Sequence, residues 1–103
     1  MLESVYQAVM VYELTKRGLQ IRSKDPVPIY WDDVRLEKGF EADVIVEDKL
    51  ILELKSLEEV PRVHKKQLLT YLRLTNCRLG LLINFGSELI KDGICRIVNG
   101  LEE

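Results

Sequence analysis

Three charged side chains that could act together, Asp43, Glu53 and Lys55, lie close to one another in this chain of 103 residues. They fall in two runs of alternating polar and apolar residues that flank a polar loop at 47–49. Alternation on both sides of a short polar loop is typical of a β-hairpin. Lys55 follows Glu53 by two positions and therefore points to the same side of its strand. The second strand of the hairpin thus carries an acid and an amine side by side.

The register of the predicted hairpin brings the two acidic residues together. With a loop of three residues, Val46 pairs with Leu50 and Asp43 lies directly opposite Glu53. Directly opposed residues are about 5 Å apart, so two negative charges there repel each other, and a cation between them removes the conflict. The other face is predicted to be entirely apolar, formed by Ala42, Val44, Val46, Leu50, Leu52 and Leu54. The alternative interpretation is a solvated hairpin face with incidental charges.

An Asp followed by Glu-X-Lys on the next strand resembles the core motif of the PD-(D/E)XK nuclease superfamily, although Ala42 stands where the name has Pro. The resemblance implies that Asp43 and Glu53 hold a divalent metal, Mg²⁺ or Mn²⁺, with the Leu54 carbonyl as a possible third ligand. It also implies that Lys55 helps to activate or place the attacking water.

An amphipathic helix is predicted from Met1 to about Gly18, because apolar residues recur at spacings of three and four. Glu3 and Tyr6 near its start resemble the Glu-X-X-Tyr of the GxxExxY family, a branch of the same superfamily. That resemblance implies that Glu3 adds a direct or water-mediated metal ligand. An acid in the first turn is also favoured by the helix macrodipole alone. The Gly of the motif would precede Met1, so we expect this chain to lack the helix that family members usually carry upstream.

A second helix is predicted over 61–75, and His64, Gln67 and Tyr71 share one of its faces. The segment that contains them resembles the corresponding GxxExxY segment. The spacing of Gln67 and Tyr71 also matches a motif that follows the Glu-X-Lys strand in several superfamily branches. The resemblance implies that Gln67 orients the site or contacts the nucleic acid.

The first turns of this helix are basic, with Arg62, Lys65 and Lys66. Cations there oppose the helix macrodipole, at a cost of about a few tenths of a kcal/mol each, so stability alone does not favour them. We predict that Lys65 and Lys66, together with His64 and Tyr71, bind the substrate. The alternatives are a solvated basic face and a tyrosine that only packs.

The remaining apolar segments predict strands at 19–23, 27–31, 35–38, 78–85 and 94–98. Pro28 restricts its strand to an edge or to a position whose amide is not needed. The run at 78–85 suits a central strand covered on both faces, with a right-handed crossover through the helix if it lies parallel to 50–55. The expected fold is α/β, a restriction-endonuclease-like core in which helices flank a mixed β-sheet, forming a single domain over 1–103.

Composition limits the partners and the compartment. A formal net charge of −2 gives no general attraction to nucleic acid, so binding requires local basic patches and acids neutralised by metal. The chain has neither an apolar run near the roughly 20 residues of a membrane span nor a secretion signal, and we expect a cytoplasmic protein. Cys77 and Cys95 are expected to be free thiols, with a disulfide as the alternative.

The function predicted from these residues is metal-dependent hydrolysis of phosphodiester bonds, with DNA rather than RNA as the expected nucleic acid. A second hypothesis is a non-enzymatic module that keeps the nuclease fold and binds nucleic acid or a protein partner. A third is that catalysis needs a homodimer, because one small domain offers little surface to hold a duplex.

Overall fold

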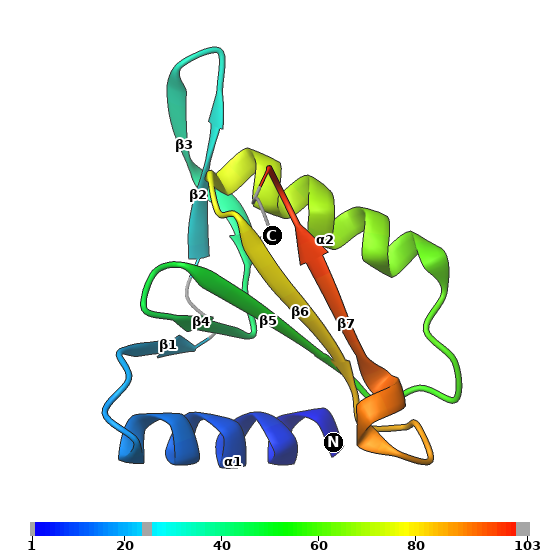
Figure 1. Cartoon of the computed structure of the whole chain (residues 1–103). Helices are drawn as coiled ribbons and strands as arrows, with labels where there is room; N and C mark the ends of the chain where they lie inside the picture. The colour runs from blue at the N-terminus through cyan, green and yellow to red at the C-terminus, as the bar shows by residue number, and fades with distance from the viewer. Residues whose placement is uncertain (1, 24–25, 101–103) are drawn as a thin grey trace.

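The central element of the computed structural model, which describes residues 2–23 and 26–100, is a five-stranded sheet of order β1-β4-β5-β6-β7 (Figure 1). Its strands are β1 (Ile21–Ser23), β4 (Val44–Val46), β5 (Leu50–Lys55), β6 (Leu79–Asn84) and β7 (Ile94–Val98). β5 and β6 run parallel, whereas the other neighbouring pairs are antiparallel. The predicted mixed sheet is confirmed, and the condition set for a crossover through the helix, that 50–55 and 78–85 run parallel, is met.

Two helices, α1 (Leu2–Lys16) and α2 (Arg62–Thr75), cover opposite faces of this sheet (Figure 1). On one face, the core consists of Leu68 and Leu72 of α2 with Ala42, Ile45, Ile51 and Leu82. On the other, Met10, Val11 and Leu14 of α1 pack against Val44, Val46, Leu52, Leu54 and Ile83. Successive residues of β5 therefore serve two cores, as expected for a strand covered on both sides. Both predicted helices are confirmed, apart from Met1, which lies outside the described residues. The predicted apolar stripe of α1 is confirmed only in part, because Val5 and Val9, which belong to it, are exposed.

The hairpin of β4 and β5 has the predicted register, with Val46 paired to Leu50. Regular pairing ends at Val44 opposite Leu52, and one step beyond that pair the same register places Asp43 opposite Glu53. The turn is made by Glu47 and Asp48, whose φ angles of 54° and 55° lie in the left-handed region typical of tight hairpins.

The prediction for Ala42 is wrong. This residue belongs to the core under α2, with Ile45 and Ile51, and not to the face of Val44. Regular pairing of β4 begins at Val44, and the chain bends at Asp43. Strict alternation of side chains therefore does not extend back to Ala42, because it holds only within a regular strand.

A separate two-stranded sheet, β2 (Pro26–Trp31) and β3 (Val34–Glu41), projects from the main body (Figure 1). Asp32 and Asp33 connect the strands with φ angles of 49° and 62°. The register shifts between Val27 and Ile29, so Pro28 lies where regular pairing is interrupted, as its missing amide requires. β3 is longer than predicted and leads directly into the bend at Asp43.

The segment after β5 is tied to the end of β6 by the buried side chain of Asn84. Its Oδ1 accepts hydrogen bonds from the amides of Leu57 and Gly86, at 2.9 and 3.1 Å, and its Nδ2 donates to the Leu57 carbonyl at 2.8 Å. β6 continues through η1 (Ile90–Gly93) into β7. These bonds fix the direction in which the chain leaves the charged end of β5.

Two further expectations from the sequence concern the cysteines and the membrane. Cys77 and Cys95 are both free thiols. Within the described ranges, no helix is long and apolar enough to cross a membrane.

Candidate active site

Glu53 lies on the side of β5 that faces α2 and is partly buried. Burial, together with the neighbouring negative charge of Asp43, raises the pKa of its carboxyl group to about 7. A hydrogen bond from the Asp43 amide and the charge of Lys55 act in the opposite direction. The predicted conflict between two close carboxylates is therefore present in the structure.

The Asp43 carboxylate is held against the main chain of the opposite strand. Its Oδ2 accepts a hydrogen bond from the Leu54 amide at 2.9 Å, and the Asp43 amide faces Glu53 Oε1 at 3.5 Å. The two acids are thus linked through the backbone of β5 and of the bend before β4. These two backbone amides hold the carboxylates of Asp43 and Glu53 close to each other.

Gln7 and Ser23 also hold Asp43, and sequence analysis missed both. Gln7 Nε2 donates to Ser23 Oγ at 2.7 Å and to the Asp43 carbonyl at 3.0 Å, while Ser23 Oγ donates to the same carbonyl at 3.2 Å. Gln7 is buried, with 8% of its surface exposed. The signal in the sequence was that Gln7 lies one helical turn after Glu3, on a helix with an apolar stripe. Its partner on β1 could not be inferred from spacing.

Glu3 is bound to the end of β5 rather than gathered with the other two acids. Its Oε1 accepts a hydrogen bond from the Ser56 amide at 3.0 Å. Tyr6 stacks on Phe85, with ring centroids 4.0 Å apart and planes 6° apart, and the Phe85 amide donates to the Lys55 carbonyl at 2.8 Å. The Glu-X-X-Tyr motif therefore docks the start of α1 beside the last residue of the Glu-X-Lys strand.

The predicted shared face of α2 is confirmed at a small cavity between α2 and the sheet. Glu53 and Lys55 of β5 line it together with His64, Gln67 and Tyr71. Gln67 Nε2 donates a hydrogen bond to the Tyr71 hydroxyl at 2.8 Å. The tertiary structure thus brings five of the predicted site residues to one place, although they come from two separate elements.

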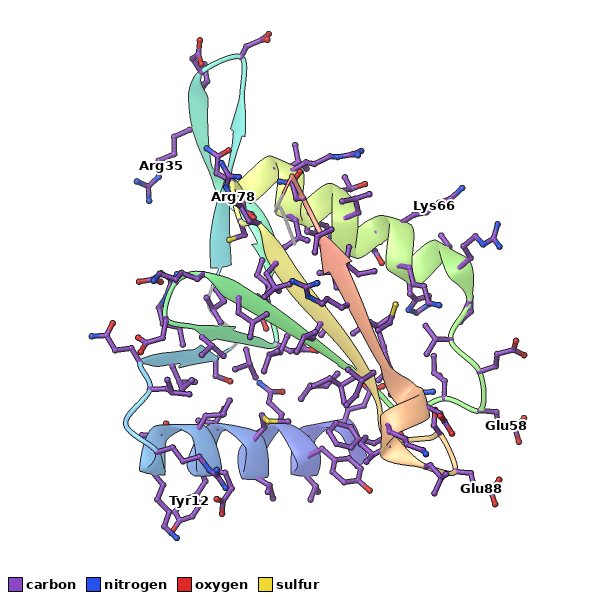
Figure 2. The ribbon with its side chains drawn as sticks, in the orientation of Figure 1. Tyr12, Arg35, Glu58, Lys66, Arg78 and Glu88 are labelled. Carbon is purple, nitrogen blue, oxygen red and sulfur yellow. The ribbon has the colours of Figure 1, made fainter. Side chains whose placement is uncertain are left out.

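Lys65 and Lys66 are exposed and do not line this cavity. Lys66 projects outward from α2 (Figure 2). Lys65 lines a different cavity, of about 260 Å³, together with Glu58, Glu59 and Asp92. The helical rotation that directs His64 and Gln67 toward the cavity beside Glu53 turns the two lysines away from that cavity. Their predicted role in substrate binding stays a prediction.

Comparison with known protein families agrees with this geometry. A family model described as the PD-(D/E)XK nuclease superfamily matches residues 1–97. The chain belongs to this superfamily. The match extends from α1 into β7 and includes every residue of the site described above. No curated protein and no solved structure matches the chain.

In the PD-(D/E)XK superfamily the acidic pair would hold a divalent metal, and the donors present fit such an ion. Asp43 and Glu53 offer the hard carboxylate oxygens that Mg²⁺ and Mn²⁺ prefer. Within residues 2–23 and 26–100, no group of three or more acidic, histidine or cysteine side chains is arranged to share a metal. Two carboxylates suffice for Mg²⁺, which usually keeps several waters. Glu3 as a third ligand stays a prediction.

Proposed function

We propose that this protein is a metal-dependent nuclease that hydrolyses phosphodiester bonds of nucleic acid. The observation that carries the proposal is the Asp43–Glu53 pair, in which a partly buried carboxyl group with a pKa raised to about 7 lies next to a second acid. A fold that served stability alone would not retain two acids in this position, because burying a charge beside a like charge is unfavourable.

The residues around the pair have distinct roles in this proposal. A metal ion held by Asp43 and Glu53 would lower the pKa of a bound water and neutralise charge on the phosphate. Lys55, which lines the same cavity as Glu53, places the attacking water and stabilises the anion that develops. Gln67, fixed by its bond to Tyr71, orients the site or contacts the nucleic acid.

Finer assignments belong to the same proposal. The docked Glu3 and Tyr6, with the segment from His64 to Tyr71, support membership of the GxxExxY branch. We also propose DNA rather than RNA as substrate, Mg²⁺ or Mn²⁺ as the metal, and a cytoplasmic location. A homodimer would enlarge the surface that holds a duplex, and its mass in solution tests this point.

The proposal is tested by metal titration and a nuclease assay on the same protein preparations. Calorimetry with Mg²⁺ and Mn²⁺ is carried out on the wild type and on Asp43→Asn and Glu53→Gln, and each protein is assayed on single-stranded and duplex DNA and RNA. Glu47→Gln, a carboxylate replaced in the turn of the same hairpin, is the matched control. Metal binding and cleavage are expected in the wild type and control, and loss of both in the other two variants.

The alternative function, a nuclease-fold module without catalysis, makes the opposite prediction. A folded wild type that binds no more metal than Glu53→Gln, and cleaves no nucleic acid, would overturn the nuclease proposal. The engagement of Glu3 with the Ser56 amide is the observation that favours this alternative, because it directs a third acid to a structural bond.

A further inference from the structure

One residue that lines the cavity between α2 and β5, His64, has a buried polar atom without a partner. His64 Nδ1 is shielded from solvent and makes no hydrogen bond within the described residues. A buried donor or acceptor without a partner is unfavourable, because it has given up its hydrogen bonds to water. The main chain of His64 is fixed, because this residue is in the first turn of α2 and its amide donates to the Pro61 carbonyl at 3.0 Å.

The cavity has the size and the lining of a water site. Its volume is about 10 Å³, and a water molecule needs roughly 10–15 Å³ and two to four polar partners. Polar groups from both elements reach it, those of Glu53, Lys55, His64, Gln67 and Tyr71, while Leu68 and Leu82 close it. A polar cavity of this size is expected to be hydrated, whereas an apolar one stays dry.

Lys55 is the neighbour with the most hydrogen-bonding capacity to offer. Gln67 Nε2 already donates to the Tyr71 hydroxyl, and Glu53 Oε1 faces the Asp43 amide. The Lys55 ammonium has three donors, and within the described residues it makes neither a hydrogen bond nor an ion pair. Its long side chain can adopt many rotamers unless something holds it.

We propose that this cavity binds one water molecule that joins His64 Nδ1 to the Lys55 ammonium, and that His64 is thereby a positioning residue for Lys55. The inference rests on the proposed function in one respect, the action of Lys55 on the attacking water. Because α2 fixes the main chain of His64, a water bound to Nδ1 restricts the amine of Lys55 in turn. Ordering a flexible group before reaction lowers the entropy lost at the reacting centre.

Four variants of the full chain separate this role from a general effect on folding. His64→Asn keeps a polar atom on Cγ, where Nδ1 is attached, and His64→Leu removes it. Val63→Asn and Val63→Leu introduce the same two residues at the adjacent position. Val63 is exposed, with 63% of its surface accessible. They control for the effect of Asn and Leu on the first turn of α2.

The first measurement is structural and needs neither metal nor substrate. Nuclear magnetic resonance of the ¹⁵N-labelled protein detects the Lys55 ammonium through its slowed proton exchange and detects long-lived water beside His64. We expect both signals in the wild type, His64→Asn and the Val63 variants, and loss of both in His64→Leu. An unchanged Lys55 ammonium signal in a folded His64→Leu would overturn the proposal, as would absence of the water signal in the wild type.

The second measurement is the single-turnover cleavage rate. Supporting residues of this kind typically contribute about 10–100-fold. We expect His64→Leu to slow cleavage about tenfold and His64→Asn to recover most of that loss. In a Lys55→Ala background, His64→Leu should have no further effect. If the wild type cleaves nothing, the proposed function fails, while the ammonium and water signals still decide whether His64 positions Lys55.

Discussion

At the scale of single residues, Glu53 is where burial and charge conflict most directly. A buried carboxylate beside Asp43 is costly, and the protein bears this cost with only Lys55 and one backbone amide in opposition. Such an arrangement is common where a carboxyl group serves chemistry rather than stability.

The raised pKa of Glu53 predicts that the metal-free protein becomes less stable as pH rises, because Glu53 then ionises in the folded state. The folded carboxyl group has a pKa of about 7 and the unfolded one about 4.5, so between these values the folded state binds more protons. The free energy of unfolding therefore falls from about pH 4.5 to about pH 7 and then levels off. Relative to the wild type, Glu53→Gln should gain on the order of 2–3 kcal/mol above pH 8.

Urea unfolding at several pH values, without metal and with excess Mg²⁺, measures this difference. Mg²⁺ should restore the wild type at high pH but not the variant, because a cation favours the ionised acid. A stability difference between wild type and Glu53→Gln that does not change between pH 5 and pH 8 would contradict the assigned cause.

Glu3 permits a second prediction at this scale, because its structural role and a metal-binding role differ in their need for charge. The amide oxygen of Gln can still accept the Ser56 hydrogen bond, which Glu3 now accepts at 3.0 Å. Glu3→Gln should therefore retain stability and metal affinity, whereas Glu3→Ala should lose about 0.5–1.5 kcal/mol of stability, the net contribution of one hydrogen bond. Calorimetry and thermal unfolding of both variants check this, and a loss of metal affinity in a stable Glu3→Gln would instead identify Glu3 as a ligand.

At the scale of elements, the charged end of β5 is held from several directions. α1 reaches it through Glu3 at the Ser56 amide, and the residue after β6 reaches it through the Phe85 amide at the Lys55 carbonyl. Asn84 then holds Leu57. The position of Lys55 is consequently set by parts of the chain that are far apart in sequence.

This arrangement requires close approach of two backbones at Gly86. A Cβ atom there would clash with the main-chain oxygen of Leu57 and lie 2.6 Å from its nitrogen. We expect Gly86→Ala to destabilise the protein by about 1–3 kcal/mol and to lower activity through displacement of Lys55. Gly18→Ala is the comparison, because it introduces backbone strain without a clash. The φ angle of Gly18 is +89°, which residues with a side chain rarely adopt, and no atom lies within 4 Å of the added Cβ. Urea unfolding gives the difference, and equal stability of Gly86→Ala and the wild type would show that the segment can shift freely.

At the scale of the whole molecule, acidic and basic residues nearly balance. The chain carries 15 Lys and Arg against 17 Asp and Glu, and Lys65 and Lys66 face away from the cavity. Attraction between the protein and a polyanion is therefore expected to depend on a few local contacts.

If the nucleic acid extends from the cavity over the first turns of α2, Lys65 and Lys66 each contact one phosphate. The double variant Lys65→Gln/Lys66→Gln should then reduce the slope of log affinity against log salt by about 2, while metal affinity stays unchanged. Fluorescence anisotropy with a labelled oligonucleotide over a salt series measures the slope. Lys91→Gln/Arg96→Gln, which changes the same charge on exposed positions of η1 and β7, is the matched control. Equal slopes in the two variants would exclude a specific role for the lysines.

Sequence alone determined the local parts of this protein. Period-two alternation gave the β4–β5 register, and period-3.6 patterns gave both helices and the shared face of His64, Gln67 and Tyr71. These features depend on neighbours in the chain, which is why they can be predicted from spacing.

Only the tertiary structure decided how distant groups meet. Gln7 and Ser23 on the Asp43 carbonyl, Glu3 on the Ser56 amide and the cavity between β5 and α2 all join segments separated by loops. The same is true of Ala42, whose face changed at the bend. Hydrogen bonds of buried groups must be satisfied by whichever partner the packing brings close, and packing is a property of the whole chain.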